Sequence, residues 1–478
     1  MGLTKRLIAR LDIKGSRLIK GVRFEGLRVV GDPSEAAFKY YQSGADELLY
    51  VDAVASLYGR NSLLELLRQN CERVFIPITA GGGVRSVADA KSLLASGADK
   101  IAINTAAIQR PELITELAQA FGKQCVVVSV QARQTSSGYW EAMTEAGREK
   151  SGLDALTWIQ KAQEAGAGEI LLTSVDRDGT CTSPDTELLA AVKDVVSVPL
   201  IFGGGISTDD QITSLLTNPC VSGVSVGAAL HSSSLDFARY KTNDFVSQKT
   251  NLLRPSCNPL FSSSTPLSGK KIAIIDYGMG NTHSLLNAFR SLGATVAISS
   301  KSHDLDSYDL LALPGVGSFP SGMAALDRLC LTPFLNEWVS QGKALLGICL
   351  GMQMLFSQSD EYSVTPGLDF IPGNVSRLPS NDFVGQRVLL PHVGWNKLMP
   401  VVPSSSSEAE YIYQYFVHSY AAINISPEYV THVSCYGEKT FAAAVRRRNI
   451  VGFQFHPERS GSEGLNILAQ TVLSVIPS

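Results

Sequence analysis

The sequence Ala-Gly-Gly-Gly-Val-Arg-Ser at residues 80–86 returns in altered form at residues 202–208, as Phe-Gly-Gly-Gly-Ile-Ser-Thr. Each triple glycine follows a short apolar run, and each precedes a helical pattern and a run of small residues, at 103–107 and at 226–229. Glycines in this position allow a tight turn at the end of a strand. Self-similarity at a fixed spacing is typical of a duplication, so we expect two copies of one β/α unit in the first half of the chain.

Short apolar runs recur throughout this half and predict strands. The predicted strands are residues 7–11, 47–51, 76–79, 100–103, 125–130, 169–173, 199–202 and 223–226. Most are apolar on both faces, which is typical of a parallel sheet covered by helices. Eight such strands with intervening helices fit a closed (β/α)8 barrel of the TIM type, here built from two half-barrel repeats.

A change in composition divides the chain. Residues 249–269 are rich in serine and proline, which is typical of a linker, and a new α/β pattern begins directly after them. We therefore expect a barrel at 1–248, a linker at 249–269 and a second α/β domain at 270–478. A polar stretch at 403–408 predicts a surface loop within the second domain.

The overall composition excludes several classes of protein. Of the 478 residues, 45% are hydrophobic and 18% are charged, and the net charge of −3 gives no basic excess, so neither disorder nor nucleic-acid binding is expected. Eight cysteines occur without a C-x-x-C pair, which favours reduced thiols and a cytoplasmic location. Charges interrupt the N-terminal stretch, which therefore does not resemble a secretory signal, and no apolar run is long enough to predict a membrane segment or membrane partner.

The second domain contains a candidate nucleophile. Residues 344–353 read as an apolar strand, a Gly-x-Cys-x-Gly turn around Cys349 and the start of a helix, which is a thiol version of a nucleophile elbow. His456 and Glu458 end another apolar strand, and on extended chain the two side chains point the same way, so that the carboxylate can orient the imidazole. The glycine-rich segment 313–318, with Gly317, offers backbone N–H groups to an oxyanion.

These motifs resemble those of the class I glutamine amidotransferases, over roughly residues 270–478. Further stretches at 276–281, 391–396 and 415–420 resemble the glutaminase subunits of imidazole glycerol phosphate synthases. The resemblance implies that Cys349 attacks the amide of glutamine, that His456 transfers the proton and that Glu458 orients His456. It also implies that Gln353 helps to hold the substrate or the intermediate.

The glycine-rich turns of the barrel are candidate phosphate sites, because they follow strands at the face where barrels of this type carry their active sites. Two duplicated cradles indicate a substrate with a phosphate at each end. The first cradle comprises Gly82, Gly83, Asn104 and Thr105, and the second comprises Asp178, Gly179, Gly204, Gly205 and Gly227.

This half resembles the cyclase subunits of imidazole glycerol phosphate synthases, over nearly all of residues 1–250, through stretches that include 11–14, 18–21 with Lys20, and 173–180. The resemblance implies that a bis-phosphorylated ribulosyl substrate receives ammonia and is cleaved and cyclised to imidazole glycerol phosphate and an aminoimidazole carboxamide ribotide (AICAR). Two carboxylates perform the acid–base steps in that family, and the first corresponds to Asp12. The second position, to which the internal repeat also points, holds Gln131, which cannot exchange protons near neutral pH.

Four further positions match a ring of charges through which ammonia enters the barrel in that family. They are Arg6, Glu47, Lys100 and Glu169. We therefore expect two domains that dock on each other in a synthase of histidine biosynthesis, with glutamine and the ribulosyl compound as substrates and with neither cofactor nor metal. Gln131 leaves alternatives open: an amidotransferase that aminates another phosphorylated or sugar-nucleotide acceptor, a glutaminase with an impaired cyclase, or a barrel that serves only as a scaffold.

Overall fold

The computed structural model describes residues 3–53, 63–242, 252–255, 265–381, 385, 387–401, 412–437 and 439–476. The chain forms two compact units, one of residues 4–258 with 389–391 and the other of residues 259–388 and 392–478 with 1–3. The predicted loop at 403–408 and most of the predicted linker lie outside the described residues.

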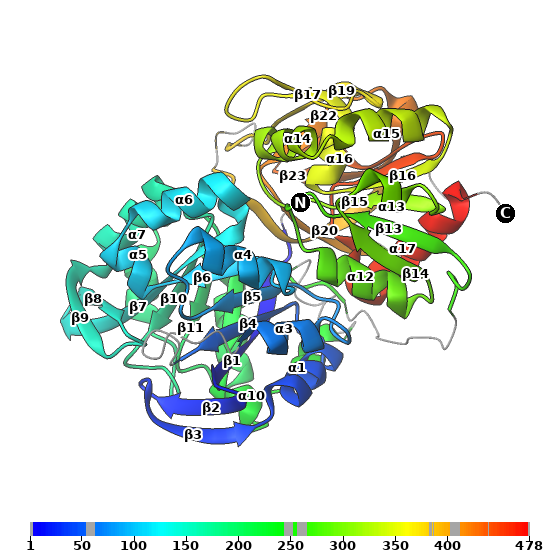
Figure 1. The fold of residues 1–478 in the computed structure, drawn as a ribbon. Helices are drawn as coiled ribbons and strands as arrows, with labels where there is room; N and C mark the ends of the chain where they lie inside the picture. The colour runs from blue at the N-terminus through cyan, green and yellow to red at the C-terminus, as the bar shows by residue number, and fades with distance from the viewer. Residues whose placement is uncertain are drawn as a thin grey trace. The chain divides into compact units, whose positions relative to one another are not determined.

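In the described part of the first unit, eight parallel strands close into a barrel, because the sheet order β10-β11-β12-β1-β4-β5-β6-β7 is completed by pairing of β7 with β10 (Figure 1). The strands are β1 (Arg6–Lys14), β4 (Glu47–Asp52), β5 (Ile78–Gly81), β6 (Lys100–Ile103), β7 (Val126–Ser136), β10 (Glu169–Ser174), β11 (Leu200–Gly203) and β12 (Gly223–Val226). The predicted barrel is confirmed.

Helices follow the barrel strands and cover the outside of the ring (Figure 1). They are α1 (Pro33–Gln42), α3 (Leu63–Asn70), α4 (Val87–Ala95), α5 (Thr105–Gln109), α6 (Glu112–Phe121), α7 (Ala155–Ala165), α8 (Thr186–Val192), α9 (Asp209–Thr217) and α10 (Ala228–His231), with 3-10 turns η1 (Lys123–Cys125) and η2 (Phe237–Lys241). Apolar side chains of alternate residues, such as Ile8, Leu49 and Leu171, fill the interior of the barrel.

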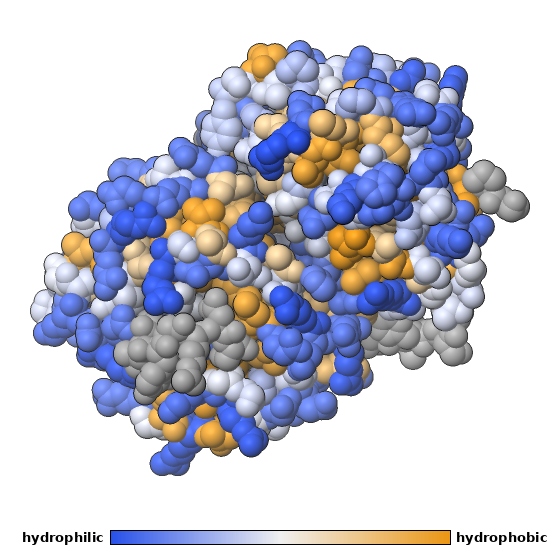
Figure 2. All heavy atoms as spheres, in the orientation of Figure 1, coloured by the Kyte–Doolittle hydropathy of each residue, from blue (hydrophilic) through white to orange (hydrophobic). Residues whose placement is uncertain are grey.

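Each half-barrel carries a strand pair that the sequence did not predict. The antiparallel strands β2 (Arg17–Val22) and β3 (Glu25–Gly31) follow β1, whereas β8 (Tyr139–Thr144) and β9 (Glu149–Asp154) follow β7. β3 and β9 contain no buried residue and therefore lack the apolar runs that identify buried strands. Apolar residues interrupt the hydrophilic surface near β2 and β3 (Figure 2), where Val22 and Val29 are exposed.

The described part of the predicted linker includes a residue that belongs to the barrel. Arg254 is buried, and its Nε donates a hydrogen bond to Asp46 Oδ1 over 2.6 Å. Lys241 Nζ also donates to Asp46 Oδ1, over 2.7 Å. The Ser/Pro-rich composition therefore conceals a segment, residues 252–255, that packs as part of the first unit.

The second unit is built on a nine-stranded sheet of order β14-β13-β15-β16-β25-β24-β23-β20-β21, of which the first five strands are parallel. Its strands are β13 (Lys271–Ile275), β14 (Thr295–Ser299), β15 (Leu310–Leu313), β16 (Ala344–Ile348), β20 (His392–Pro400), β21 (Ile412–His418), β23 (Val430–Tyr436), β24 (Lys439–Arg447) and β25 (Ile450–Phe453). The predicted α/β architecture of this domain is confirmed.

A smaller sheet and a set of helices complete this unit (Figure 1). The smaller sheet contains β17 (Phe356–Ser359), β18 (Thr365–Pro366), β19 (Ile371–Arg377) and β22 (Tyr420–Ile423). The helices are α12 (Thr282–Ser291), α13 (Ser302–Leu305), α14 (Phe319–Arg328), α15 (Leu331–Ser340), α16 (Leu350–Met354) and α17 (Gly461–Val475), with 3-10 turns η3 (Pro427–Tyr429) and η4 (Pro457–Arg459). The strand-to-helix turn from β16 to α16 holds Cys349.

Candidate functional site

Cys349 stands at a strained turn between strand β16 and helix α16. Its backbone has φ 54° and ψ −108°, a combination that side chains with a Cβ rarely adopt and that is common at active sites. The turn tolerates only glycine at position 351, because a Cβ there would lie 1.8 Å from the carbonyl oxygen of Leu313. The structure thus contains the nucleophile elbow that the Gly-x-Cys-x-Gly sequence predicts.

His456 and Glu458 form a buried pair beyond strand β25. His456 Nδ1 lies 2.7 Å from Glu458 Oε1, although Glu458 is in the 3-10 turn η4 and not on extended chain as the sequence suggested. Burial opposes a charge on the imidazole, but the charges of Glu458 and Cys349 outweigh burial and raise the pKa of His456 well above its ordinary value. His456 Nε2 has no hydrogen-bond partner among the described residues, so this nitrogen is available to a thiol or substrate.

Two glutamine side chains connect this site to the smaller sheet. Gln353 Nε2 donates hydrogen bonds to the carbonyl oxygen of Tyr420 over 2.8 Å and to Gln454 Oε1 over 3.0 Å. Gln454 Nε2 in turn donates to Cys349 Sγ over 3.8 Å. The sequence analysis missed Gln454, which lies two residues before His456 and is therefore carried to the site by the same strand end.

The glycine-rich segment after β15 contacts the elbow through its backbone. Gly317 has a φ of 142°, and the N–H of Leu350 donates a hydrogen bond to the carbonyl oxygen of Gly315 over 3.3 Å. The backbone N–H of the residue after a nucleophile commonly stabilises an oxyanion. In this structure that N–H, of Leu350, donates to the carbonyl oxygen of Gly315 instead.

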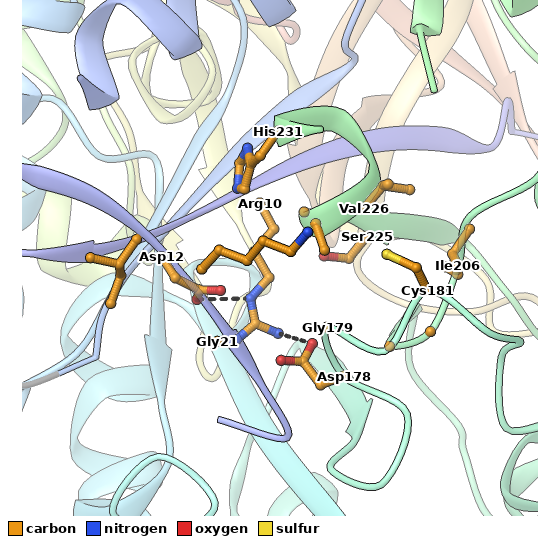
Figure 3. A pocket seen from close by; sticks show the side chains of 16 residues that line it. Arg10, Asp12, Gly21, Asp178, Gly179, Cys181, Ile206, Ser225, Val226 and His231 are labelled. Atoms are coloured by element: carbon orange, nitrogen blue, oxygen red, sulfur yellow. Dashed lines mark hydrogen bonds and ion pairs between the residues drawn. The ribbon is translucent and has the colours of Figure 1, made fainter. Parts of the chain in front are cut away.

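Two cavities formed by described residues lie where the barrel strands end, and Asp12 lines both. The larger cavity, of about 270 Å³, is lined by Gly82, Gly83, Asn104, Thr105 and Gln131 among others. The smaller cavity, of about 30 Å³, is lined by Lys20, Asp178, Gly179, Gly204, Gly205 and Gly227 among others (Figure 3). The barrel residues that the sequence singled out for catalysis or phosphate binding therefore gather around two adjoining cavities.

Polar contacts fix the wall of the larger cavity. Asn104 Nδ2 donates hydrogen bonds to the carbonyl oxygens of Ser129 and Met143, over 2.9 and 3.1 Å. Thr105 Oγ1 accepts a hydrogen bond from the backbone N–H of Glu145 over 3.0 Å. Gln131 is 5% exposed, and its Oε1 has no hydrogen-bond partner among the described residues. A buried acceptor without a partner is costly, so this oxygen is suited to a donor on a ligand.

Arg10, which the sequence analysis missed, occupies the centre of the smaller cavity's wall (Figure 3). Its Nε lies 2.9 Å from Asp12 Oδ1, and its Nη1 lies 3.8 Å from Asp178 Oδ1. Burial raises the pKa of Asp178 to about 6, because the nearby Arg10 only partly compensates for the loss of water and Asp12 adds like charge. The sequence signal that could have identified Arg10 is a charged residue at an inward-facing position of the otherwise apolar strand β1.

The four ring residues lie together in the barrel interior, and all four side chains are fully buried. Arg6 Nη1 lies 2.9 Å from Glu47 Oε2, and Arg6 also pairs with Glu169. Lys100 Nζ lies 2.7 Å from Glu47 Oε1 and 2.6 Å from Glu169 Oε2. Two cations and two anions alternate, so each charge has two partners of opposite sign and the burial of the ring is compensated.

The described residues contain neither a metal-ligand cluster nor a membrane-spanning helix. Within those ranges, no group of three or more His, Cys, Asp or Glu side chains is arranged to hold a metal ion. No helix there has both the length and the apolar character needed to cross a bilayer.

Comparison with known proteins assigns both units. Residues 6–236 match the family described as histidine biosynthesis protein, and residues 273–475 match the class-I glutamine amidotransferases. The imidazole glycerol phosphate synthase subunit HisF of Legionella pneumophila is 58% identical over 201 residues, which cover 42% of this chain and 95% of that protein. The chain belongs to the HisF family. The HisF subunit of Streptococcus sanguinis is 43% identical over 239 residues, covering 50% of this chain and 95% of that protein.

The chain therefore joins a HisF-type barrel to a class-I glutamine amidotransferase domain, which makes it an enzyme of the amidotransferase and imidazole glycerol phosphate synthase type. The HisF subunit of Corynebacterium urealyticum gives the same result, with 50% identity over 208 residues that cover 43% of this chain and 82% of that protein.

Proposed function

We propose that this HisF-family chain performs both steps of an imidazole glycerol phosphate synthase. Its second domain releases ammonia from glutamine, and its barrel uses that ammonia on a bis-phosphorylated ribulosyl substrate to give imidazole glycerol phosphate and AICAR. The single observation that carries the proposal is the presence, in one chain, of Cys349 in a nucleophile elbow with a buried His456–Glu458 pair and of a HisF-type barrel with two adjoining cavities.

The geometry of the second domain supports the first step. The Cys349 thiolate attacks the side-chain amide carbon of glutamine, and the His456 imidazolium gives its proton to the departing ammonia. Water then hydrolyses the thioester to glutamate, with His456 accepting a proton. Glu458, at 2.7 Å from Nδ1, stabilises the imidazolium and directs Nε2 to the sulfur. We propose that Gln353 contacts the substrate and that Gln454 positions the sulfur of Cys349.

The second step requires an acceptor in the barrel. A substrate with two phosphates can place its body in the larger cavity and one terminal phosphate in the smaller cavity, because the two adjoin at Asp12. We propose that the two domains dock and that ammonia passes the ring of Arg6, Glu47, Lys100 and Glu169 before it reaches Asp12. The alternating charges support this role. Apolar residues in the same place would stabilise the barrel about as well as a buried charged ring, so stability alone does not account for the ring.

The test is product formation by the purified chain. With glutamine and the ribulosyl substrate, we expect glutamate and imidazole glycerol phosphate in equal amounts. The Cys349→Ala variant should make the imidazole product only when ammonium is supplied. Absence of the imidazole product at every ammonium concentration would contradict the cyclase step, whereas absence of glutamate release would contradict the glutaminase step.

A second candidate function has specific observations in its favour. Gln131 stands where the family's second acid–base carboxylate is expected, and Arg10 forms an ion pair with the first, Asp12. These two features favour an amidotransferase that aminates a different phosphorylated acceptor without closing an imidazole ring. Glutamate release stimulated by other sugar phosphates, but not by the ribulosyl substrate, would support this candidate.

A further inference from the structure

Arg10 is a buried cation with incomplete partners. It lies on strand β1 between Ala9 and Leu11, which are fully buried, and is itself 5% exposed. Its Nε is used by Asp12, and its Nη1 faces Asp178 and Thr173 Oγ1, the latter at 3.4 Å. No hydrogen-bond partner for Nη2 is found among the described residues, although Arg10 lines the smaller cavity. A guanidinium has five donors and no acceptor, so the remaining donors require an acceptor from a ligand or from solvent.

The internal repeat shows that this cation belongs to one half-barrel alone. Arg10 precedes Asp12 by two residues on β1, and Ser129 precedes Gln131 by two residues on β7. Both positions point inward, because side chains two residues apart on a strand share a face. Arg10 lines the cavity of about 30 Å³, whereas Ser129 lines the cavity of about 270 Å³. The two cradles are therefore unequal in charge and in size.

A second cation faces the same small cavity. Lys20, on strand β2, also lines it and forms neither a hydrogen bond nor an ion pair with any described residue. Glycines make up much of the remaining wall, so the ligand can approach the backbone closely (Figure 3). The carboxylates of Asp12 and Asp178 also line this cavity and pair with Nε and Nη1 of Arg10, so the donors left for a ligand are Arg10 Nη2 and Lys20 Nζ. Two cationic donors beside a glycine-lined wall suit a compact, doubly charged group, and phosphate with arginine is a strong charge-assisted pair.

We propose that Arg10 is a specificity-determining residue of the barrel, which binds the phosphate of a phosphate monoester in the smaller cavity together with Lys20 while its Nε remains paired with Asp12. This inference rests on the proposed function only in taking the barrel cavities as the substrate site. It adds to that function a residue that couples phosphate binding to the position of the acid–base group. A ligand without a terminal phosphate would leave the Nη2 donor without an acceptor, so we expect it to bind weakly.

Arg10 connects Asp12 to the phosphate site proposed in the smaller cavity. Arg10 cannot lose its proton near neutral pH, so the ion pair fixes Asp12 beside a permanent cation. Movement of the guanidinium toward a phosphate would move Asp12 with it, because the pair between Nε and Oδ1 is kept. Phosphate binding in the smaller cavity would thereby set the position of Asp12 in the larger one, which it also lines.

The experiment uses the full chain and measures binding without turnover. Titration calorimetry with glycerol 3-phosphate, inorganic phosphate and, as a carboxylate of similar size to phosphate, acetate would be done for wild type, Arg10→Ser, Arg10→Lys and the control Arg28→Ser, whose side chain is exposed on β3. Alkylation of Cys181, which lines the smaller cavity, gives an independent readout of occupancy by peptide mapping.

We expect Arg10→Ser to weaken glycerol 3-phosphate binding by about ten- to a hundredfold and to abolish phosphate protection of Cys181. Arg10→Lys should lose less, Arg28→Ser should match wild type, and acetate should neither bind nor protect. Equal affinity in wild type and Arg10→Ser would overturn the inference, as would tighter binding of acetate or no phosphate binding by the wild type. Thermal unfolding and glutamate release establish that each variant is folded. Because no imidazole product is measured, failure here is distinct from failure of the proposed synthase reaction.

Discussion

Arg10 Nε and Asp12 Oδ1 lie 2.9 Å apart at the end of barrel strand β1. The carboxylate assigned to acid–base chemistry by family resemblance is thus paired with an arginine, while the position of its expected partner holds Gln131, whose Oε1 has no hydrogen-bond partner among the described residues. The barrel therefore differs from a site with two free carboxylates at both positions, because Asp12 is paired with Arg10 and the other position holds Gln131. The consequences of this departure can be measured.

Restoring the second carboxylate should accelerate cyclisation. We expect Gln131→Asp to raise the rate of imidazole product formation by about 10²-fold or more, because a positioned general acid or base typically contributes 10²–10⁴-fold. The rate is measured with ammonium as the nitrogen source, which separates the barrel from the glutaminase. Gln131→Asn is the matched control, since its shorter amide cannot titrate. Equal rates for the Asp and Asn variants would show that proton transfer at this position does not limit the reaction.

Removing the charge that orients His456 should impair glutamine hydrolysis. Glu458→Gln keeps the size of the side chain but loses the carboxylate 2.7 Å from Nδ1, so we expect kcat for glutamate release to fall by about 10²-fold or more. Because Glu458 raises the pKa of His456, whose protonated form gives the proton to ammonia, the variant should also shift the basic limb of the pH–rate profile to lower pH. Glu428→Gln, at an exposed position, should leave both unchanged. A Glu458→Gln enzyme with wild-type kcat would refute the assigned triad.

Breaking the charge ring should loosen the barrel. Lys100→Met leaves the fully buried carboxylates of Glu47 and Glu169 with Arg6 as the remaining ring cation, and loss of one partner of a buried ion pair typically costs about 3–5 kcal/mol. Hydrogen exchange of peptides from β1 and β6, followed by mass spectrometry, reports on the barrel separately from the second domain. Lys91→Met, exposed on α4, is the control. Unchanged protection in Lys100→Met would mean that the ring contributes no stability.

Glu361 should make the stability of the second domain depend on pH. Burial raises the pKa of Glu361 from 4.5 to about 7, despite a hydrogen bond of 2.7 Å from the N–H of Phe319 at the start of α14. The folded state therefore favours the protonated form, and the wild type should lose stability as pH rises from about 4.5 to 7. Glu361→Gln removes this loss and should gain in melting temperature relative to wild type as pH rises through that window.

Glu337→Gln, an exposed change on α15, serves as the control for this prediction. Parallel melting curves for wild type and Glu361→Gln at every pH would contradict a raised pKa for Glu361.

The elements that sequence predicts are those with a local signature. Buried barrel strands are apolar runs, and the turn around Cys349 has a glycine on either side because the backbone there admits nothing larger. β3 and β9 were missed because none of their residues is buried and they follow no apolar period. Five of the six residues of β8 are buried, but Glu141 interrupts their apolar pattern.

The contacts that sequence cannot predict depend on which residues the fold brings together. The pairing of Arg10 with Asp178 joins residues from β1 and from the segment after β10, which only the closed barrel makes neighbours. Arg254 lies in a Ser/Pro-rich segment, a composition that does not predict burial. It is buried in an ion pair with Asp46, which is distant in the sequence. Even the His456–Glu458 pair, predicted from spacing, forms through a 3-10 turn instead of a strand.

The most direct test of an internally coupled synthase is to follow nitrogen from glutamine into the product. The chain would be given glutamine labelled with ¹⁵N in its side-chain amide, the ribulosyl substrate and excess unlabelled ammonium. If ammonia passes from Cys349 to the barrel without mixing with solvent, as we propose, the imidazole product has a higher ¹⁵N fraction than the free ammonium pool. A product labelled only to the level of the pool, or no imidazole product at all, would contradict the proposed function.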